Sequence, residues 1–221
     1  GTILATPSAR MTNWLVKSVV LIILLPLTAG VAPAGVRTKI LVMGDSISAA
    51  YGIQREAGWV ALLDERLGAM GSQWQVVNAS ISGETTGGGL ARLASALATH
   101  DPGIVIIELG GNDGLRGYPV VKIRDNLDRL VALSKAQSRH VLLIGMQIPP
   151  NYGPRYVNAF ASMYREIAAQ RNVALVPFLL EKVALTPGLM QSDGIHPRAE
   201  AQPQLLDTVW AELVEMLGGS V

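Results

Sequence analysis

Cysteine is absent from this chain of 221 residues. Its absence excludes disulfide bonds, a cysteine nucleophile and thiolate metal sites. Charged residues make up 16% of the chain and aromatic residues 5%, and the formal net charge is +1. With so little net charge and no long run of one sign, nothing predicts a nucleic-acid partner. Hydrophobic residues, at 49%, suffice for the core of one globular domain.

An apolar run near the N-terminus predicts a secretory signal. Residues 11–17 carry one positive charge and no acid, residues 19–27 are apolar, and residues 32–34 are Ala-Pro-Ala, which suits a cleavage site. The apolar run is shorter than the ~20 residues that span a bilayer. We therefore expect residues 1–34 to be a leader and signal peptide, and residues 35–221 to form the functional domain of a periplasmic or secreted protein. A buried helix and an uncleaved signal anchor are the alternatives.

Short apolar segments alternate with amphipathic segments along the rest of the chain. Runs rich in Val, Ile and Leu predict strands buried in a parallel sheet at residues 39–43, 75–78, 104–109, 141–145 and 173–176. Helical spacing of apolar residues predicts helices at residues 59–70, 90–99, 120–137, 157–171 and 203–217. In the first helix we expect Val60, Leu63 and Leu67 to share the buried face. The alternation predicts an α/β doubly wound fold.

The segment Asp193-Gly194-Ile195-His196-Pro197 places a carboxylate three residues before an imidazole. Such a carboxylate fixes the tautomer of a histidine that accepts and returns a proton. Ser46, in Gly44-Asp45-Ser46, follows the first predicted strand and is the candidate nucleophile. Ligands of open parallel sheets bind beyond the carboxyl ends of the strands, so Ser46 and His196 should share one rim. His100 and His140 precede strands and should lie at the opposite rim.

Two further residues follow predicted strands and suit the stabilisation of an oxyanion. Gly83 follows the second strand and Asn112 the third. With the backbone N–H of Ser46, they are the expected donors to a developing oxyanion. Each also has a plain structural interpretation: a helix N-cap for Ser46, a turn glycine for Gly83, and a turn or cap for Asn112. Asp45 and Asp113 are expected to make turn or cap hydrogen bonds within their own loops.

The sequence predicts neither a metal nor another cofactor. Glu84, Glu108 and Asp113 are too scattered along the chain to join Asp193 and His196 in a convincing three-ligand site. The glycines at 87–89 lack the Gly-Lys-Ser/Thr sequence of a phosphate-binding loop. A G-x-S-x-G nucleophile elbow is also absent, because Ser48 occupies the position of its last glycine.

Ser46, Gly83, Asn112 and His196, in this order, resemble the signature of the SGNH or GDSL hydrolases. Gly44-Asp45-Ser46-Ile47 resembles the first block of that family, with Ile in place of the usual Leu, and further blocks match residues 77–83, 108–117 and 193–197. The bacterial periplasmic thioesterase, arylesterase and lysophospholipase subgroup is the most similar, because residues 147–153 and Tyr156 resemble its fourth-strand loop.

This resemblance extends over residues 39–217. It implies a flavodoxin-like three-layer sandwich with a five-stranded parallel sheet. It also implies hydrolysis of acyl-CoA thioesters, short aryl esters and lysophospholipids in a shallow, mobile site.

Ile148, Pro149 and Tyr152 are the candidate substrate-binding residues. They are expected to form an apolar wall beside the nucleophile, which favours an acyl chain, although ordinary loop packing would account for them as well. The sequence thus predicts a monomeric serine hydrolase that forms an acyl-enzyme on Ser46, takes small esters or thioesters and contacts membrane lipid transiently. A carbohydrate O-deacetylase or acyltransferase is the alternative chemistry, and a non-catalytic acyl- or glycan-binding module is the alternative class.

Overall fold

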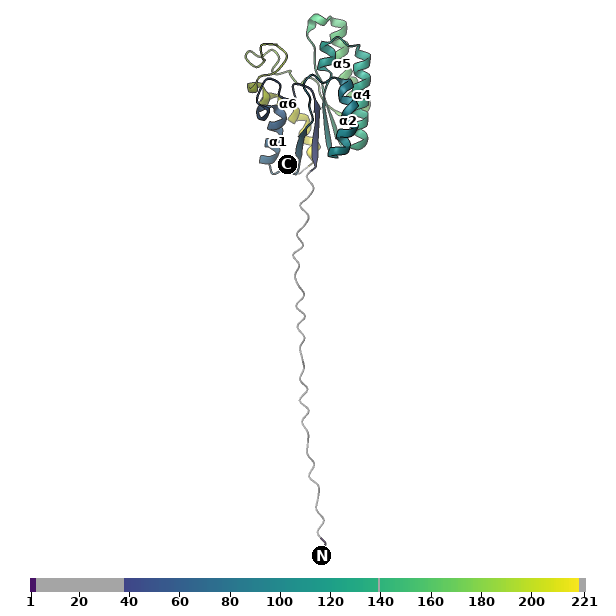
Figure 1. The fold of residues 1–221 in the computed structure, drawn as a ribbon, viewed down its shortest axis with the longest axis vertical. Helices are drawn as coiled ribbons and strands as arrows, with labels where there is room; N and C mark the ends of the chain where they lie inside the picture. The colour runs from purple at the N-terminus through teal and green to yellow at the C-terminus, as the bar shows by residue number, and fades with distance from the viewer. Residues whose placement is uncertain (3–37, 139, 219–221) are drawn as a thin grey trace. The chain divides into compact units, whose positions relative to one another are not determined.

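A computed structural model describes residues 1–2, 38–138 and 140–218 (Figure 1). The predicted signal segment therefore lies outside the described residues. The strands form one all-parallel, five-stranded sheet in the order β2-β1-β3-β4-β5. Their bounds are Lys39–Gly44 (β1), Gln75–Asn78 (β2), Ile104–Glu108 (β3), His140–Ile144 (β4) and Ala174–Val176 (β5).

Helices cover both faces of this sheet. The α-helices are α1 (Trp59–Ala69), α2 (Thr86–His100), α3 (Gly111–Leu115), α4 (Val120–Gln137), α5 (Pro154–Arg171) and α6 (Gln202–Leu213). Figure 1 shows α1 and α6 on one side of the sheet and α2, α4 and α5 on the other. The three-layer sandwich and its five parallel strands are as predicted.

Apolar periodicity explains why these segments fold as they do. Every residue of β3 is buried, as expected for a strand covered by helices on both faces. In α1, Val60, Leu63 and Leu67 are buried, so the predicted face of this helix is confirmed. In α4, residues from Ile123 to Ser134 at helical spacing face the core.

α2 and α5 begin three or more residues earlier than the sequence predicts. α2 includes the glycines at 87–89, which are poor helix formers. The Thr85 side chain caps its N-terminus by accepting the N–H of Gly88 at 3.1 Å. A Cβ atom at Gly89 would lie 2.5 Å from Leu109 Cδ1, so close packing requires this glycine. α5 begins at Pro154, at a position where proline is favourable.

Short 3-10 turns complete the described chain. They are Arg55–Ala57, Pro150–Tyr152, Ala199–Ala201 and Val214–Leu217. The last of them follows α6, which therefore ends four residues before the predicted boundary. No helix among the described residues is both long and apolar enough to cross a bilayer.

Tyr164 of α5 connects this helix to the end of β3. Its buried hydroxyl donates a hydrogen bond to the carbonyl oxygen of Leu109 at 2.9 Å. Gly110 follows with φ of +113°, and a Cβ atom there would lie 2.3 Å from the Tyr164 hydroxyl oxygen. The contact therefore fixes the path of the chain as it leaves the sheet.

We expect Tyr164→Phe to lower the free energy of unfolding by about 1–3 kcal/mol, because a buried carbonyl loses its donor. Urea denaturation measures this change. Tyr156→Phe is the matched control, since the Tyr156 hydroxyl also donates to a backbone carbonyl, that of Tyr118, but at an exposed position that water can reach. Equal losses in the two variants would contradict the importance of the buried bond.

Candidate active site

Ser46 lies in a turn directly beyond the carboxyl end of β1. The backbone N–H of Tyr51 donates to the carbonyl oxygen of Ser46 at 3.0 Å, and the N–H of Ala49 donates to that of Asp45 at 2.9 Å. The next helical segment begins only at Arg55, so Ser46 does not cap a helix. The turn leaves Ser46 9% exposed, with its side chain at the rim of the sheet.

His196 and Asp193 approach Ser46 from the loop that precedes α6. His196 Nε2 lies 2.8 Å from Ser46 Oγ, and His196 Nδ1 lies 2.6 Å from Asp193 Oδ2. The other carboxylate oxygen of Asp193 accepts the backbone N–H groups of Ile195 at 2.9 Å and His196 at 3.0 Å. These contacts join three residues from opposite ends of the chain into one hydrogen-bonded series.

The pKa of Asp193 determines where the protons of this series lie. Burial opposes ionisation of Asp193, but hydrogen bonds from the His196 ring and from two backbone N–H groups lower its pKa to about 2. Asp193 is therefore a carboxylate at neutral pH and holds a proton on Nδ1 of the imidazole. Nε2 is then free to accept the hydroxyl hydrogen of Ser46.

The other two histidines lie away from Ser46. His140 begins β4 and pairs in register with Ile104, the first residue of β3. His100 ends α2, just before β3. Both positions are at the amino-terminal rim of the sheet, as predicted.

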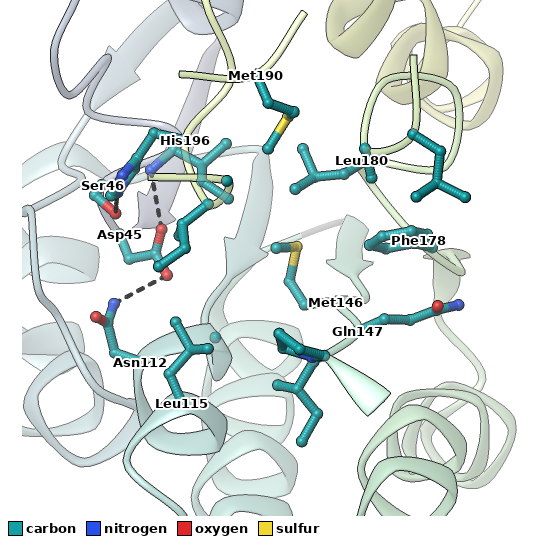
Figure 2. A pocket seen from close by; sticks show the side chains of 18 residues that line it. Asp45, Ser46, Asn112, Leu115, Met146, Gln147, Phe178, Leu180, Met190 and His196 are labelled. Atoms are coloured by element: carbon teal, nitrogen blue, oxygen red, sulfur yellow. Dashed lines mark hydrogen bonds between the residues drawn. The ribbon is translucent and has the colours of Figure 1, made fainter. Parts of the chain in front are cut away.

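Asn112 lies on α3, a five-residue helix that the sequence did not predict. Its Nδ2 donates to Asp45 Oδ2 at 3.2 Å and to the carbonyl oxygen of Glu84 at 3.0 Å, so both amide hydrogens are engaged. Asn112 lines the same pocket as Ser46 and His196 (Figure 2).

Gly83 lies after β2 with φ of +80°, a backbone conformation that favours glycine. A Cβ atom there would meet nothing within 4 Å. Its carbonyl oxygen accepts a hydrogen bond from Arg116 Nη2 at 3.4 Å. Among the described residues, Gly83 is not part of the pocket wall that contains Ser46 and Asn112.

Asp45 forms more than the local turn contact expected of it. Its Oδ1 accepts the N–H of Ile47 at 3.0 Å, which is the predicted local bond, but its Oδ2 reaches Asn112. Burial raises the pKa of Asp45 to about 6, against the lowering effect of hydrogen bonds from Ile47 and Asn112. Burial and the neighbouring charge of Asp45 raise the pKa of Glu108 well above its ordinary value.

The expectation that Asp113 bonds within its own loop is wrong. Its carboxylate accepts the backbone N–H of Thr86 at 2.9 Å and the Thr86 hydroxyl at 2.6 Å. Asp113 therefore ties α3 to the start of α2. Sequence spacing alone could not predict this bond, because its partner lies 27 residues away on another helix.

A pocket of about 440 Å³ opens beside the Ser46 side chain (Figure 2). Its wall includes apolar side chains from α3 and from several loops at this rim: Leu115, Met146, Ile148, Pro149, Phe178, Leu180 and Met190. No sequence motif pointed to Phe178 or Leu180. Both lie in the segment that follows the end of β5 at Val176, so the rule that ligands bind beyond strand ends could have identified them.

Tyr152 is placed differently from Ile148 and Pro149. Within the described part of the chain, Tyr152 is not in the pocket wall. Its hydroxyl donates to the carbonyl oxygen of Leu115 at 2.6 Å, and its ring stacks on Tyr156 with centroids 6.2 Å apart. Tyr152 therefore supports a pocket residue from behind.

Gln191 and Tyr51 connect the nucleophile turn to the histidine loop, and no sequence motif pointed to either residue. Gln191 Nε2 donates to the carbonyl oxygens of Tyr51 at 2.9 Å and Pro197 at 3.1 Å. The Tyr51 ring lies against the imidazole of His196, with centroids 4.5 Å apart. A Cβ atom at Gly52 would lie 2.4 Å from Gln191 Oε1, so this contact is closely packed.

The described residues contain no cluster of three or more His, Cys, Asp or Glu side chains that could hold a metal ion. A hydroxyl, an imidazole that can accept its proton and an ionised carboxylate can together perform nucleophilic catalysis.

Comparison with known proteins places this arrangement among related enzymes. The chain is 54% identical over 178 residues to esterase TesA of Pseudomonas aeruginosa, covering 80% of this chain and 89% of that protein. It is 43% identical over 180 residues to thioesterase 1/protease 1/lysophospholipase L1 of Escherichia coli, covering 81% and 85%.

A solved structure is similar as well. The psychrotrophic esterase EstA from Pseudoalteromonas sp., in a structure inhibited by monoethylphosphonate, has a TM-score of 0.78 and 44% identity, covering 82% of this chain and all of that one. The model of the GDSL-like lipase/acylhydrolase family matches residues 42–202, which include Ser46 and His196. The chain belongs to the GDSL-like lipase/acylhydrolase family.

Proposed function

We propose that this protein hydrolyses carboxylic esters and thioesters through an acyl-enzyme on Ser46. The observation that carries the proposal is the hydrogen-bonded series Ser46–His196–Asp193, with distances of 2.8 and 2.6 Å. His196 accepts the hydroxyl proton as Ser46 Oγ attacks the acyl carbon, and then returns it to the departing alcohol or thiol. Water, deprotonated by the same imidazole, then releases the acid and restores Ser46.

The oxyanion of each tetrahedral intermediate is assigned three donors: the backbone N–H groups of Ser46 and Gly83, and Nδ2 of Asn112. The Asn112 hydrogen that points to Asp45 forms the longer of its two bonds, at 3.2 Å. A fully formed oxyanion competes for that hydrogen better than a neutral carbonyl does. The donor therefore favours the transition state over the bound substrate.

The substrate class follows from the pocket. Its apolar wall, which includes Ile148 and Pro149, favours an acyl chain. Tyr152 supports this wall through its hydrogen bond to the carbonyl oxygen of Leu115. The names of the relatives from Pseudomonas and Escherichia point to esters, thioesters and lysophospholipids. The substrate of a carbohydrate O-deacetylase is an acetate ester whose alcohol part is a polar sugar. Assays of acetylated sugars and of acyl thioesters, run side by side, therefore distinguish the two activities.

We also propose where the protein is located and what its pocket contacts. We assign residues 1–34 as a secretory signal and place the mature protein in the periplasm or outside the cell, as a monomer. Leu185, which is 97% exposed, and Ile195, which is 40% exposed, both line the pocket. Exposed apolar side chains at a pocket of this kind suit transient contact with a lipid aggregate that holds the substrate.

We expect Ser46→Ala to reduce the hydrolysis of p-nitrophenyl esters to the assay background, because the variant lacks the hydroxyl that is hydrogen-bonded to His196 Nε2 at 2.8 Å. The melting temperature should stay close to that of the wild type. An alkyl phosphonate should label Ser46 in the wild type and leave the variant unlabelled, as peptide mass spectrometry would show. Esterase activity in a folded Ser46→Ala protein would falsify the assignment.

We expect kcat/KM to show a limb that rises with pH, because Ser46 needs an imidazole free to accept its proton and because Asp45, whose pKa burial raises to about 6, ionises in this range. Asp193 does not contribute to this limb, because its lowered pKa of about 2 keeps it ionised throughout the assay range. A pH series on a p-nitrophenyl ester measures the limb. His100→Ala and His140→Ala serve as controls, and loss of the limb in either would contradict the placement of the histidines.

We expect Asn112→Ala to lower kcat by roughly 10²-fold or more while KM changes little, because its donor acts mainly on the transition state. Steady-state kinetics on several esters provide the measurement. An unchanged kcat in the folded variant would remove Asn112 from the site and leave only the two backbone donors.

A further inference from the structure

Two carboxylic acids are buried together behind the nucleophile. Glu108 is the last residue of β3 and pairs in register with Gly44, so it lies beside the point where β1 leads into Asp45. Asp45 is 3% exposed and Glu108 is 0% exposed. No basic side chain among the described residues forms a salt bridge with either acid. Two negative charges on neighbouring buried carboxylates, with no cation to pair with either, are strongly unfavourable. The pair therefore retains a proton.

The hydrogen bonds of the two acids differ. Both oxygens of Asp45 accept N–H groups, from Ile47 at 3.0 Å and from Asn112 at 3.2 Å. Glu108 Oε2 accepts the Ser48 hydroxyl at 2.7 Å and the Asp45 N–H at 3.3 Å. Glu108 Oε1 is buried and receives no hydrogen bond from the described residues. An oxygen without a donor is the natural position for a proton, and the side chains of Glu108 and Asp45 are close enough to share a hydrogen bond.

The amide of Asn112 gives a second reason to place the charge on Asp45. Its NH2 group faces the Asp45 side chain (Figure 2) and the carbonyl oxygen of Glu84. A carboxylate and a carbonyl can only accept hydrogen bonds, so only the NH2 end of the amide satisfies both. A protonated Asp45 could instead donate to Asn112 Oδ1, and the amide could then turn its oxygen toward the nucleophile.

We propose that Glu108 holds the proton of this pair, so that Asp45 remains a carboxylate and keeps the NH2 end of Asn112 turned toward the reaction centre. Glu108 and Asp45 are then positioning residues that act through Asn112. The raised pKa of Glu108, caused by burial and by the charge of Asp45, agrees with this distribution. The inference rests on the proposed function of Asn112 as an oxyanion donor.

Infrared difference spectroscopy locates the proton without reference to activity. The wild-type protein at neutral pH should show the carbonyl stretch of a buried protonated carboxylic acid, and Glu108→Gln should lose it. Glu166→Gln, a change at an exposed acid of α5, is the matched control and should retain the band. Absence of the band from the wild type, or its persistence in Glu108→Gln, would overturn the proposal.

Kinetics test the consequence for Asn112. Asp45→Asn presents both an amide NH2 and a carbonyl to Asn112, so it no longer selects one end of that amide. We expect kcat to fall by at least about tenfold with KM within about twofold of the wild type. Glu108→Gln can still donate to Asp45 and accept from Ser48, so it should retain most of kcat, whereas Glu108→Leu should not.

These outcomes separate the inference from the function on which it rests. If Asn112→Ala keeps its full kcat, the oxyanion assignment fails, although the infrared band still reports where the proton lies. If Asn112→Ala loses kcat and Asp45→Asn does not, the donor stands and the positioning role of Asp45 is wrong. Should Asp45→Asn fail to fold, the comparison of wild type with Glu108→Gln by infrared still decides the location of the proton.

Discussion

The parallel pairing of β1 with β3 is the constraint on which the site depends. Its register sets Gly44 opposite Glu108, so the loops that carry Ser46 and Asn112 leave the sheet side by side. Both strands are buried between helix layers, which makes a shift of register costly, because it would expose apolar side chains and misplace every contact at the rim. The nucleophile, the amide of Asn112 and the buried acid pair all follow from this pairing.

His196 reaches the nucleophile by a different route. Ser46 and His196 are 150 residues apart, and the histidine comes from a loop rather than a strand end. Contacts outside the reacting atoms hold that loop in place: the side chain of Gln191 bonds to the carbonyl of Tyr51, 140 residues away, and the Tyr51 ring packs on the imidazole. Loop residues supported in this way can present catalytic groups as rigidly as a strand does.

Carboxylic acids near the nucleophile have opposite environments. Asp193 lies at the rim, where hydrogen bonds from His196 and two backbone N–H groups stabilise its charge and lower its pKa. Asp45 and Glu108 are buried behind the nucleophile, where burial raises the pKa of both. In the proposed mechanism the carboxylate of Asp193 thus stabilises the imidazolium that forms on His196, while the buried pair is held to a single charge behind Ser46. The difference arises from solvent access and hydrogen bonds rather than from residue type.

The sequence by itself determined the order of the five strands and of the helices other than α3, because apolar periodicity records which faces are buried. It also located Ser46, His196 and Asp193 through short motifs with local geometry. It also placed His100 and His140 at the far rim, since residues before a parallel strand lie at its amino end. Only the tertiary structure decided that Asp113 bonds to Thr86, that Tyr152 supports Leu115 from behind, and that Asp45 and Glu108 share a buried site. Each of these contacts joins separate elements. Such contacts depend on strand register and helix packing, which no local pattern in the sequence specifies.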